Sequence, residues 1–291
     1  MKKTIQEPIS LLDFLQINFP NSSKNKLRKM LSSGRVVVNS QPIHKAKHKL
    51  SSGDIFELFN RDVIKQPIEE PNKNLTKHDI EIIYEDDDIL VVNKPSKLLS
   101  VATDRLENLT LHSKCVDYLK LSNEKSWCYI VHRLDKETSG IMLMSKNKTS
   151  KEYLQQQFAQ RGVYRIYHAI VEGRPEGEIG TLTQYLLEDK NLNIKSVKQK
   201  HKDGKQAITH WEVLDYDEST SLIRVMIETG RRHQIRMAMK ELGCPIVGDE
   251  IHGAQTNPLG RICLHATSLE FLHPKSDEPI YFESKPPFAK I

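Results

Sequence analysis

The sequence predicts an α+β protein in which a small basic module precedes a larger domain built mainly from antiparallel strands. Short runs rich in β-branched and aromatic residues recur throughout residues 79–291, whereas helical periodicity is restricted to a few segments. The charge is also divided unevenly. Residues 1–78 hold 14 lysines and arginines against 7 acidic residues, while residues 79–291 hold 29 against 31. Such a basic module is typical of proteins that bind a polyanion such as nucleic acid, although a merely soluble basic surface is the alternative.

The basic module is expected to occupy residues 1–60. Ser10 stands before an amphipathic pattern and has Asp13 three positions after it, which is typical of a capped helix. A second helix is expected to end near Gly34, because glycine readily adopts the left-handed conformation that follows many helices. The strands expected in this module are residues 35–39 and 55–58.

Residues 61–78 combine prolines with many charges and show no sustained periodicity, so we expect an interdomain linker there. The larger domain is then expected to span residues 79–291. Its expected strands are residues 80–84, 89–93, 141–144, 163–171, 207–214, 222–227, 261–271 and 280–282, and its expected helices are residues 149–161 and 233–242. Four consecutive acidic residues, 85–88, predict a solvated turn rather than a metal site.

Several classes of site are not indicated by the composition. The four cysteines have no CxxC spacing, which argues against a structural zinc site and a disulfide framework and fits a reducing cytoplasm. The motifs GxGxxG, GxxxxGK[ST] and HExxH do not occur. The first residues contain no apolar run long enough for a signal peptide or a membrane span. We therefore expect a soluble cytoplasmic monomer that uses no metal, no nucleotide or other organic cofactor and no membrane.

The most informative segment is residues 132–140, which read HRLDKETSG. Asp135 lies between Arg133 and Lys136, and both cations favour the ionised carboxylate that a nucleophile requires. An aspartate among basic residues is by itself more often part of a solvated loop, so this chemistry alone leaves both interpretations open.

The same string resembles the active-site motif of pseudouridine synthases of the ribosomal large-subunit type, the RluA superfamily. Further blocks of the sequence resemble that family and occur in its order along the chain. They are residues 89–101 upstream and residues 230–236, 243–249 and 264–266 downstream. The resemblance implies the pseudouridine synthase fold, with a mixed, mostly antiparallel sheet and flanking helices. Residues 1–60 in turn resemble the small α/β RNA-binding domain named after ribosomal protein S-four.

The resemblance also implies roles for single residues. Asp135 would be the nucleophile, and whether it attacks the ribose or the base is left open. Tyr167 would stack on the flipped base, although a tyrosine in a strand is by itself more often a core residue. Arg236 would pair with Asp135 and keep its carboxylate ionised. The residues expected to contact the substrate are Arg133 and Leu264 in the catalytic domain and Lys26, Arg28, Lys29 and Arg35, on phosphates, in the basic module.

These features predict an enzyme that isomerises uridine to pseudouridine in RNA, with large-subunit ribosomal RNA favoured and transfer RNA as the alternative substrate. Two other classes are kept as alternatives, namely a catalytically silent RNA-binding factor in ribosome assembly and a base-removing glycosylase. The lysine-rich residues 190–205 are interpreted either as an insertion that contacts RNA or as a plain solvated loop.

Overall fold

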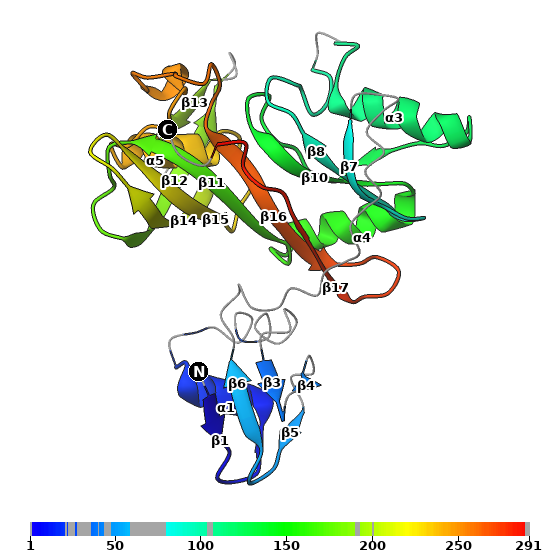
Figure 1. Cartoon of the computed structure of the whole chain (residues 1–291), viewed down its shortest axis with the longest axis vertical. Coiled ribbons are helices and arrows are strands. Elements are labelled where there is room, and N and C mark those ends of the chain that lie inside the picture. The colour runs from blue at the N-terminus through cyan, green and yellow to red at the C-terminus, as the bar shows by residue number, and fades with distance from the viewer. Residues whose placement is uncertain are drawn as a thin grey trace. The chain divides into compact units, whose positions relative to one another are not determined.

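The computed structural model of the protein describes residues 2–20, 22, 27, 36–39, 41–43, 48–58, 80–103, 107–189, 193–199 and 201–288. They belong to two compact units, residues 1–70 and 71–291. Figure 1 shows both units, and each has a hydrophobic core of its own. The expected linker, all but residues 22 and 27 of the second helix expected in the basic module, and four of that module's cations lie outside the described residues. These cations are Lys26, Arg28, Lys29 and Arg35.

In the described part of the first unit, helix α1 (Leu11–Asn18) packs against short strands. This helix begins where the Ser10 hydroxyl accepts a hydrogen bond from the backbone N–H of Asp13 at 3.2 Å, which confirms the expected N-cap. Leu11 and Phe56 are fully buried in the core beneath this helix. One sheet has the strand order β1 (Lys2–Thr4), β6 (Ile55–Leu58), β3 (Val36–Val38) and β4 (Gln41–Pro42), and a second pairs β2 (Ile9–Ser10) with β5 (Lys49–Leu50).

The second unit is built on a sheet of 11 strands. Along its main path they are β13 (Ile194–Ser196), β12 (Ile179–Glu188), β14 (Lys205–Tyr216), β15 (Thr220–Ile227), β11 (Tyr164–Glu172), β16 (Leu264–Leu272), β10 (Ser139–Ser145), β8 (Ile89–Lys94) and β7 (Glu81–Glu85). The remaining two strands are β17 (Pro279–Glu283), which pairs with β16, and β9 (Tyr129–Ile130), which pairs with β10. Among the strands of this unit that the structure describes, only β10 and β16 pair in parallel, so the predicted α+β class is confirmed.

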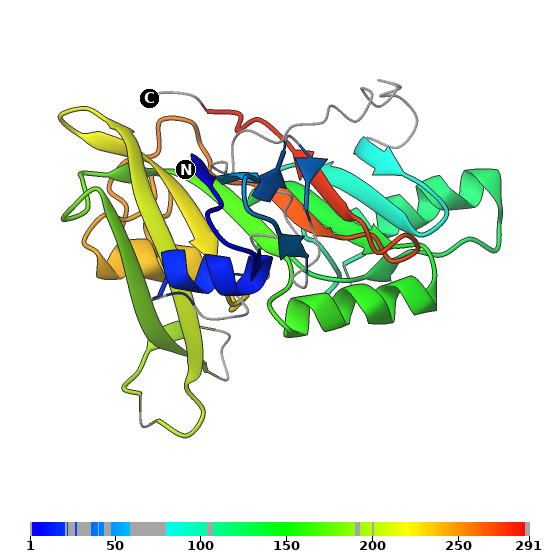
Figure 2. The ribbon, with the colours of Figure 1, turned by 90° about the horizontal axis from the view of Figure 1, so that it is seen from below.

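Helices cover both faces of this sheet (Figures 1 and 2). They are α3 (Leu111–Ser122), α4 (Lys148–Ala159), α5 (Gln234–Glu241) and the 3-10 helix η2 (Glu250–His252). Leu90 of β8 lies in the core that includes α3, whereas its neighbour Val91 lies in the core that includes α4. Successive side chains of a strand point to opposite faces, so β8 runs between two hydrophobic cores. No helix in the described part of the chain is both long enough and apolar enough to cross a membrane.

The strands and helices expected in the larger domain are present with small shifts of their ends. The short elements β9, β13 and η2 were not predicted, and neither were the longer α3 and β12. The buried residues of α3, Leu111, Cys115, Val116 and Leu119, are separated by serine, lysine and aspartate. In β12, the residue buried beside the apolar Leu186 is Gln184, and Ile179 is exposed. A periodicity test that counts apolar residues therefore misses both elements.

The parallel pairing of β10 with β16 anchors the loop that precedes β10. Gly140 pairs with Ala266, and a Cβ atom at position 140 would lie 2.3 Å from the carbonyl oxygen of Ala266. Gly140 also has a φ of +115°, which L-residues with a side chain rarely adopt. Only glycine permits this close approach of the two strands, so the loop carrying Asp135 leaves the sheet at a fixed point.

Candidate active site

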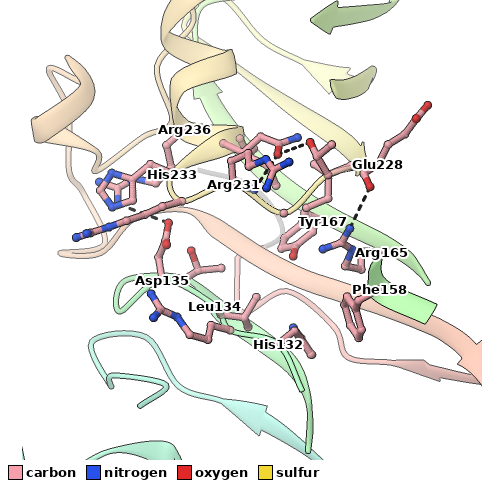
Figure 3. Close-up of a pocket in the computed structure, with 18 of the residues that line it drawn as sticks. His132, Leu134, Asp135, Phe158, Arg165, Tyr167, Glu228, Arg231, His233 and Arg236 are labelled. Carbon is pink, nitrogen blue, oxygen red and sulfur yellow. Dashed lines mark hydrogen bonds and ion pairs between the residues drawn. The ribbon is translucent and has the colours of Figure 1, made fainter. Parts of the chain in front are cut away.

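A cavity of about 560 Å³ lies in the second unit, bounded by the loop before β10, the end of α4, strands β11 and β15, and the turn before α5 (Figure 3). All five residues that the sequence singled out in the catalytic domain line this cavity. They are Asp135, Tyr167, Arg236, Arg133 and Leu264. The fold thus gathers residues from four separate sequence blocks around one space.

Residues of the block at 89–101 hold the loop that carries Asp135 by hydrogen bonds to its backbone. The fully buried Lys94 donates hydrogen bonds from Nζ to the carbonyl oxygens of Leu98 at 2.7 Å and of Lys136 at 3.0 Å. Ser100 donates its hydroxyl to the carbonyl oxygen of Leu134 at 2.6 Å and accepts the N–H of the same residue at 3.2 Å. These bonds hold the backbone on both sides of Asp135.

The carboxylate of Asp135 experiences opposing electrostatic effects. Burial in the cavity raises its pKa, while the nearby Arg236, Arg232, Arg133 and Lys94 lower it, and the net shift is upward. Burial lowers the pKa of Lys94 to about 7, although the negative charge of Asp135 acts to raise it. The Asp135 carboxylate is therefore neither freely solvated nor held in a tight ion pair.

Arg236 lies close to Asp135, but its main partner is a residue that the sequence analysis did not select. Its Nη1 is 3.8 Å from Oδ2 of Asp135, whereas Nε and Nη2 donate to the two carboxylate oxygens of Asp249 at 2.7 and 2.6 Å. Both Arg236 and Asp249 are almost completely buried. Asp249 thus fixes the guanidinium by a bidentate pair and leaves one edge of it facing Asp135. The block at 243–249 contained Asp249, yet nothing in the sequence indicated its partner.

Tyr167 is buried in β11 and faces the cavity. Burial raises the pKa of its hydroxyl, and the negative charge of Asp135 acts in the same direction. The positive charge of Arg165 lowers this pKa, but the net shift is upward. Leu264 of the neighbouring strand β16 also lines the cavity and is 3% exposed. An aromatic ring and an aliphatic side chain therefore supply apolar surface beside the carboxylate, as a pocket for a planar base requires.

Comparison with known proteins assigns this site to a family. Residues 88–241 match the family described as RNA pseudouridylate synthase. The chain belongs to this family. It is therefore a pseudouridine synthase, an enzyme that isomerises uridine to pseudouridine.

Relatives of the synthase extend over nearly the whole chain. It is 34% identical to an uncharacterized RNA pseudouridine synthase of Bacillus subtilis, over 91% of this chain and 86% of that protein. It is 33% identical to ribosomal large subunit pseudouridine synthase C of Rickettsia felis, over 98% of this chain and 96% of that protein. The structure of human RNA pseudouridylate synthase domain containing 4 matches with a TM-score of 0.60 and 23% identity, covers 71% of this chain and 88% of that one, and supports the fold.

The synthase cavity contains a second group of residues that the sequence analysis missed. The ring of His132 stacks on that of Phe158, with centroids 4.9 Å apart, and the guanidinium of Arg165 lies 5.3 Å from the Phe158 centroid. His132 accepts the backbone N–H of Leu143 at Nε2, and burial lowers its pKa to about 3, so the ring is neutral. In the view of Figure 3, Tyr167 lies between Asp135 and Arg165.

Exposed cations surround the mouth of the synthase cavity. Arg133, Arg161 and Arg231 are exposed and line it, and Arg232 is half-buried beside them. A second cavity of about 540 Å³ shares Arg231 and Arg232 with the first and includes residues 202–205 of the lysine-rich segment. The second cavity is also lined by Glu188 and Asp203, but its four cations outnumber them and are suited to the phosphates of an RNA strand.

Proposed function

We propose that this synthase modifies a uridine of large-subunit ribosomal RNA and that Asp135 is the nucleophile acting on a flipped-out nucleotide. The observation that carries the proposal is the position of Asp135 inside a cavity of about 560 Å³, with Arg236 at 3.8 Å and Tyr167 in the wall. A stacked base cannot enter such a cavity, so the uridine must leave its stack or belong to an unpaired segment.

Arg236 supports the charge of the nucleophile. A carboxylate attacks only in its ionised form, and burial raises the pKa of Asp135 and so disfavours that form. Because Asp249 holds Arg236 by two hydrogen bonds, the guanidinium stays in place whether or not Asp135 is bonded to the substrate. This arrangement serves attack on the ribose and attack on the base equally well.

The other selected residues would receive the nucleotide. Tyr167 is proposed to stack on the flipped base and Leu264, on the neighbouring strand, to add apolar surface beside it, because both side chains face the cavity. Arg133 is exposed at the mouth, directly before the loop residue Leu134, and is proposed to hold the displaced strand. Stacking energies of about 1–3 kcal/mol per base are available for such a contact.

Ribosomal RNA is favoured as the substrate by the relatives. The proteins of Rickettsia felis and Vibrio cholerae are named ribosomal large subunit pseudouridine synthase C, and the latter is 31% identical over 92% of this chain and 86% of its own length. We propose residues 1–60 as an S-four-like RNA-binding domain, 61–78 as its linker and 79–291 as the catalytic domain. The module cations proposed to contact phosphates are Lys26, Arg28, Lys29 and Arg35.

One chain is proposed to be sufficient for this activity in the cytoplasm, since the cavity is formed within a single catalytic unit. The isomerisation conserves every atom of the substrate and requires no oxidant, reductant or group donor. Loss of free uracil would instead indicate a glycosylase, and mass balance of the RNA separates the two reactions.

The test is chemical mapping of pseudouridine in ribosomal and transfer RNA from the source cell, with the gene deleted and then restored as wild type, Asp135→Asn or Asp87→Asn. Asp87 is an exposed aspartate outside the cavity and serves as the matched control. We expect one or more sites in large-subunit RNA to vanish on deletion and to return with wild type and Asp87→Asn but not with Asp135→Asn. Return with Asp135→Asn would reject the nucleophile, and sites confined to transfer RNA would reject the proposed substrate.

A further inference from the structure

Arg165 is a buried cation in the wall of the cavity, and the proposed function gives it no role. Its side chain comes from β11, two residues before Tyr167, and is 8% exposed. The only hydrogen bond from its side chain to the described residues runs from Nη2 to the carbonyl oxygen of Glu228 at a long 3.5 Å, and Nε is buried without a partner among those residues. Burial lowers the pKa of this guanidinium, which shows that the site disfavours its charge.

Each of the other arginines that line the cavity is either paired with a carboxylate or exposed to solvent. Arg236 is paired with Asp249, Arg161 with Glu228 at 3.2 Å, and Arg232 with Glu188. Arg133 and Arg231 are exposed to solvent. A desolvated guanidinium without a carboxylate partner costs free energy, so its presence points to an anionic partner that is present only during function.

The surroundings hold the guanidinium in position without neutralising it. Its Cζ lies 5.3 Å from the ring centroid of Phe158. On another side, a Cβ atom at Gly230 would lie 2.9 Å from Nη1, so the glycine leaves room for the guanidinium. These contacts fix the Arg165 side chain beside the cavity. Its positive charge lowers the pKa of the Tyr167 hydroxyl.

The position of Arg165 relative to Tyr167 suits the edge of a base. Residues i and i+2 of a strand point to the same face, about 7 Å apart. A base stacked on Tyr167 would therefore extend toward Arg165 on one side while its sugar lies toward Asp135 on the other (Figure 3). The donors of Arg165 would then meet the carbonyl oxygens of the uracil.

The reaction creates an anion at this place. Cleavage of the bond between C1′ of the ribose and N1 of uracil sends the bonding electron pair to N1, from which it is delocalised onto O2 and O4. When Asp135 acts on the ribose, its carboxylate compensates the electron-deficient C1′, by a bond or by pairing. An electron pair from C5 then forms the new bond to C1′, the proton on C5 is lost, and N1 takes up a proton, so that the product is an isomer of the substrate.

We propose that Arg165 is a catalytic residue of this synthase that binds the detached uracil anion through its carbonyl oxygens. The proposal rests on the function assigned to Asp135 and Tyr167. A buried guanidinium interacts weakly with neutral uracil and strongly with the anion, so it stabilises the state with the broken bond more than the ground state. A role in phosphate binding is less favoured, because the exposed arginines at the mouth lie where a phosphate would stay hydrated.

The experiment compares wild type with Arg165→Met, Arg165→Lys and Arg165→Ala. The substrates are ribosomal RNA and, in parallel, transfer RNA from cells that lack the gene, tritiated at C5 of uridine. Tritium release is followed in single turnovers at saturating enzyme. We expect Arg165→Met to slow release by about 10²–10³-fold, the usual loss for one such donor, with the Kd for RNA changed less than about threefold. Arg165→Lys should retain part of the rate, and added methylguanidinium should restore part of it in Arg165→Ala.

Arg174→Met is the matched control, because Arg174 is a charged arginine of the same unit that stacks on Tyr216 and does not line the cavity. A rate for Arg165→Met within threefold of this control would overturn the proposal. So would a weakened Kd with an unchanged saturating rate, which would identify a phosphate contact. If wild type releases tritium only from transfer RNA, the proposed substrate is rejected and the same comparison is made on that RNA.

Discussion

We expect the ionisation of Asp135, the proposed nucleophile, to set the acid limit of catalysis. Because burial raises its pKa, we expect the single-turnover rate to fall as the pH is lowered through a value above the ordinary one for aspartate. Arg232 is among the cations that lower this pKa, so Arg232→Gln should raise the pKa further and move the acid limb to higher pH. Rates measured from about pH 4 to 8 test this, with Arg174→Gln as control. An acid limb at the same pH in wild type and Arg232→Gln would contradict it.

Asp249 is expected to contribute to both stability and activity. Replacing Asp249 by asparagine keeps the shape of the side chain but leaves the charge of Arg236 buried without its bidentate partner. Removing one partner of a buried pair costs about 3–5 kcal/mol. We therefore expect urea denaturation to show a loss of this size, together with slower turnover. Asp87→Asn, at a side chain that is 94% exposed, should stay within about 0.5 kcal/mol of wild type. Equal stability of the two variants would show that Arg236 does not need Asp249.

At the level of elements, the approach of β10 to β16 should tolerate no side chain at Gly140. Gly140→Ala would place a methyl group 2.3 Å from a backbone oxygen that cannot move without breaking strand pairing. We expect a loss of about 1–3 kcal/mol or more in unfolding free energy, and a further loss of activity since the Asp135 loop is displaced. Gly173→Ala is the matched control, because Gly173 also has a positive φ but nothing within 4 Å of its ideal Cβ. It should lose only the conformational cost, about 1 kcal/mol.

Elements whose apolar residues are regularly spaced could be predicted from the sequence, and those stabilised by other contacts could not. Strand β10 is buried throughout and was predicted, whereas β12 buries a glutamine and was not. The same division holds in the site. Asp135 and Tyr167 are found from local motifs, but the pairing of Arg236 with Asp249 joins α5 to the turn before η2, and the position of Arg165 depends on Phe158 and Gly230. Such contacts between distant segments arise only when the chain has folded.

For the whole molecule, we expect the basic residues that precede the catalytic domain to supply salt-dependent affinity for RNA. Residues 1–78 carry a net charge of +7 from 14 basic and 7 acidic residues, whereas the remainder is close to neutral. Each phosphate contact contributes about 0.7–0.9 to the slope of log K against log salt concentration. Replacing the four proposed contact residues of the module by glutamine should therefore reduce this slope by up to about 2.8–3.6. They are Lys26, Arg28, Lys29 and Arg35.

The intrinsic chemistry should be affected much less than binding, because the cavity lies entirely within residues 71–291. Filter binding at several salt concentrations and single-turnover rates at saturating enzyme separate the two quantities. The matched control neutralises four lysines of the catalytic unit that do not line the cavity, namely Lys120, Lys125, Lys151 and Lys275. If both quadruple variants change the salt slope equally, total charge rather than the module attracts the RNA. A slope reduced only by the module variant, with an unchanged saturating rate, assigns RNA capture to the first unit and isomerisation to the second.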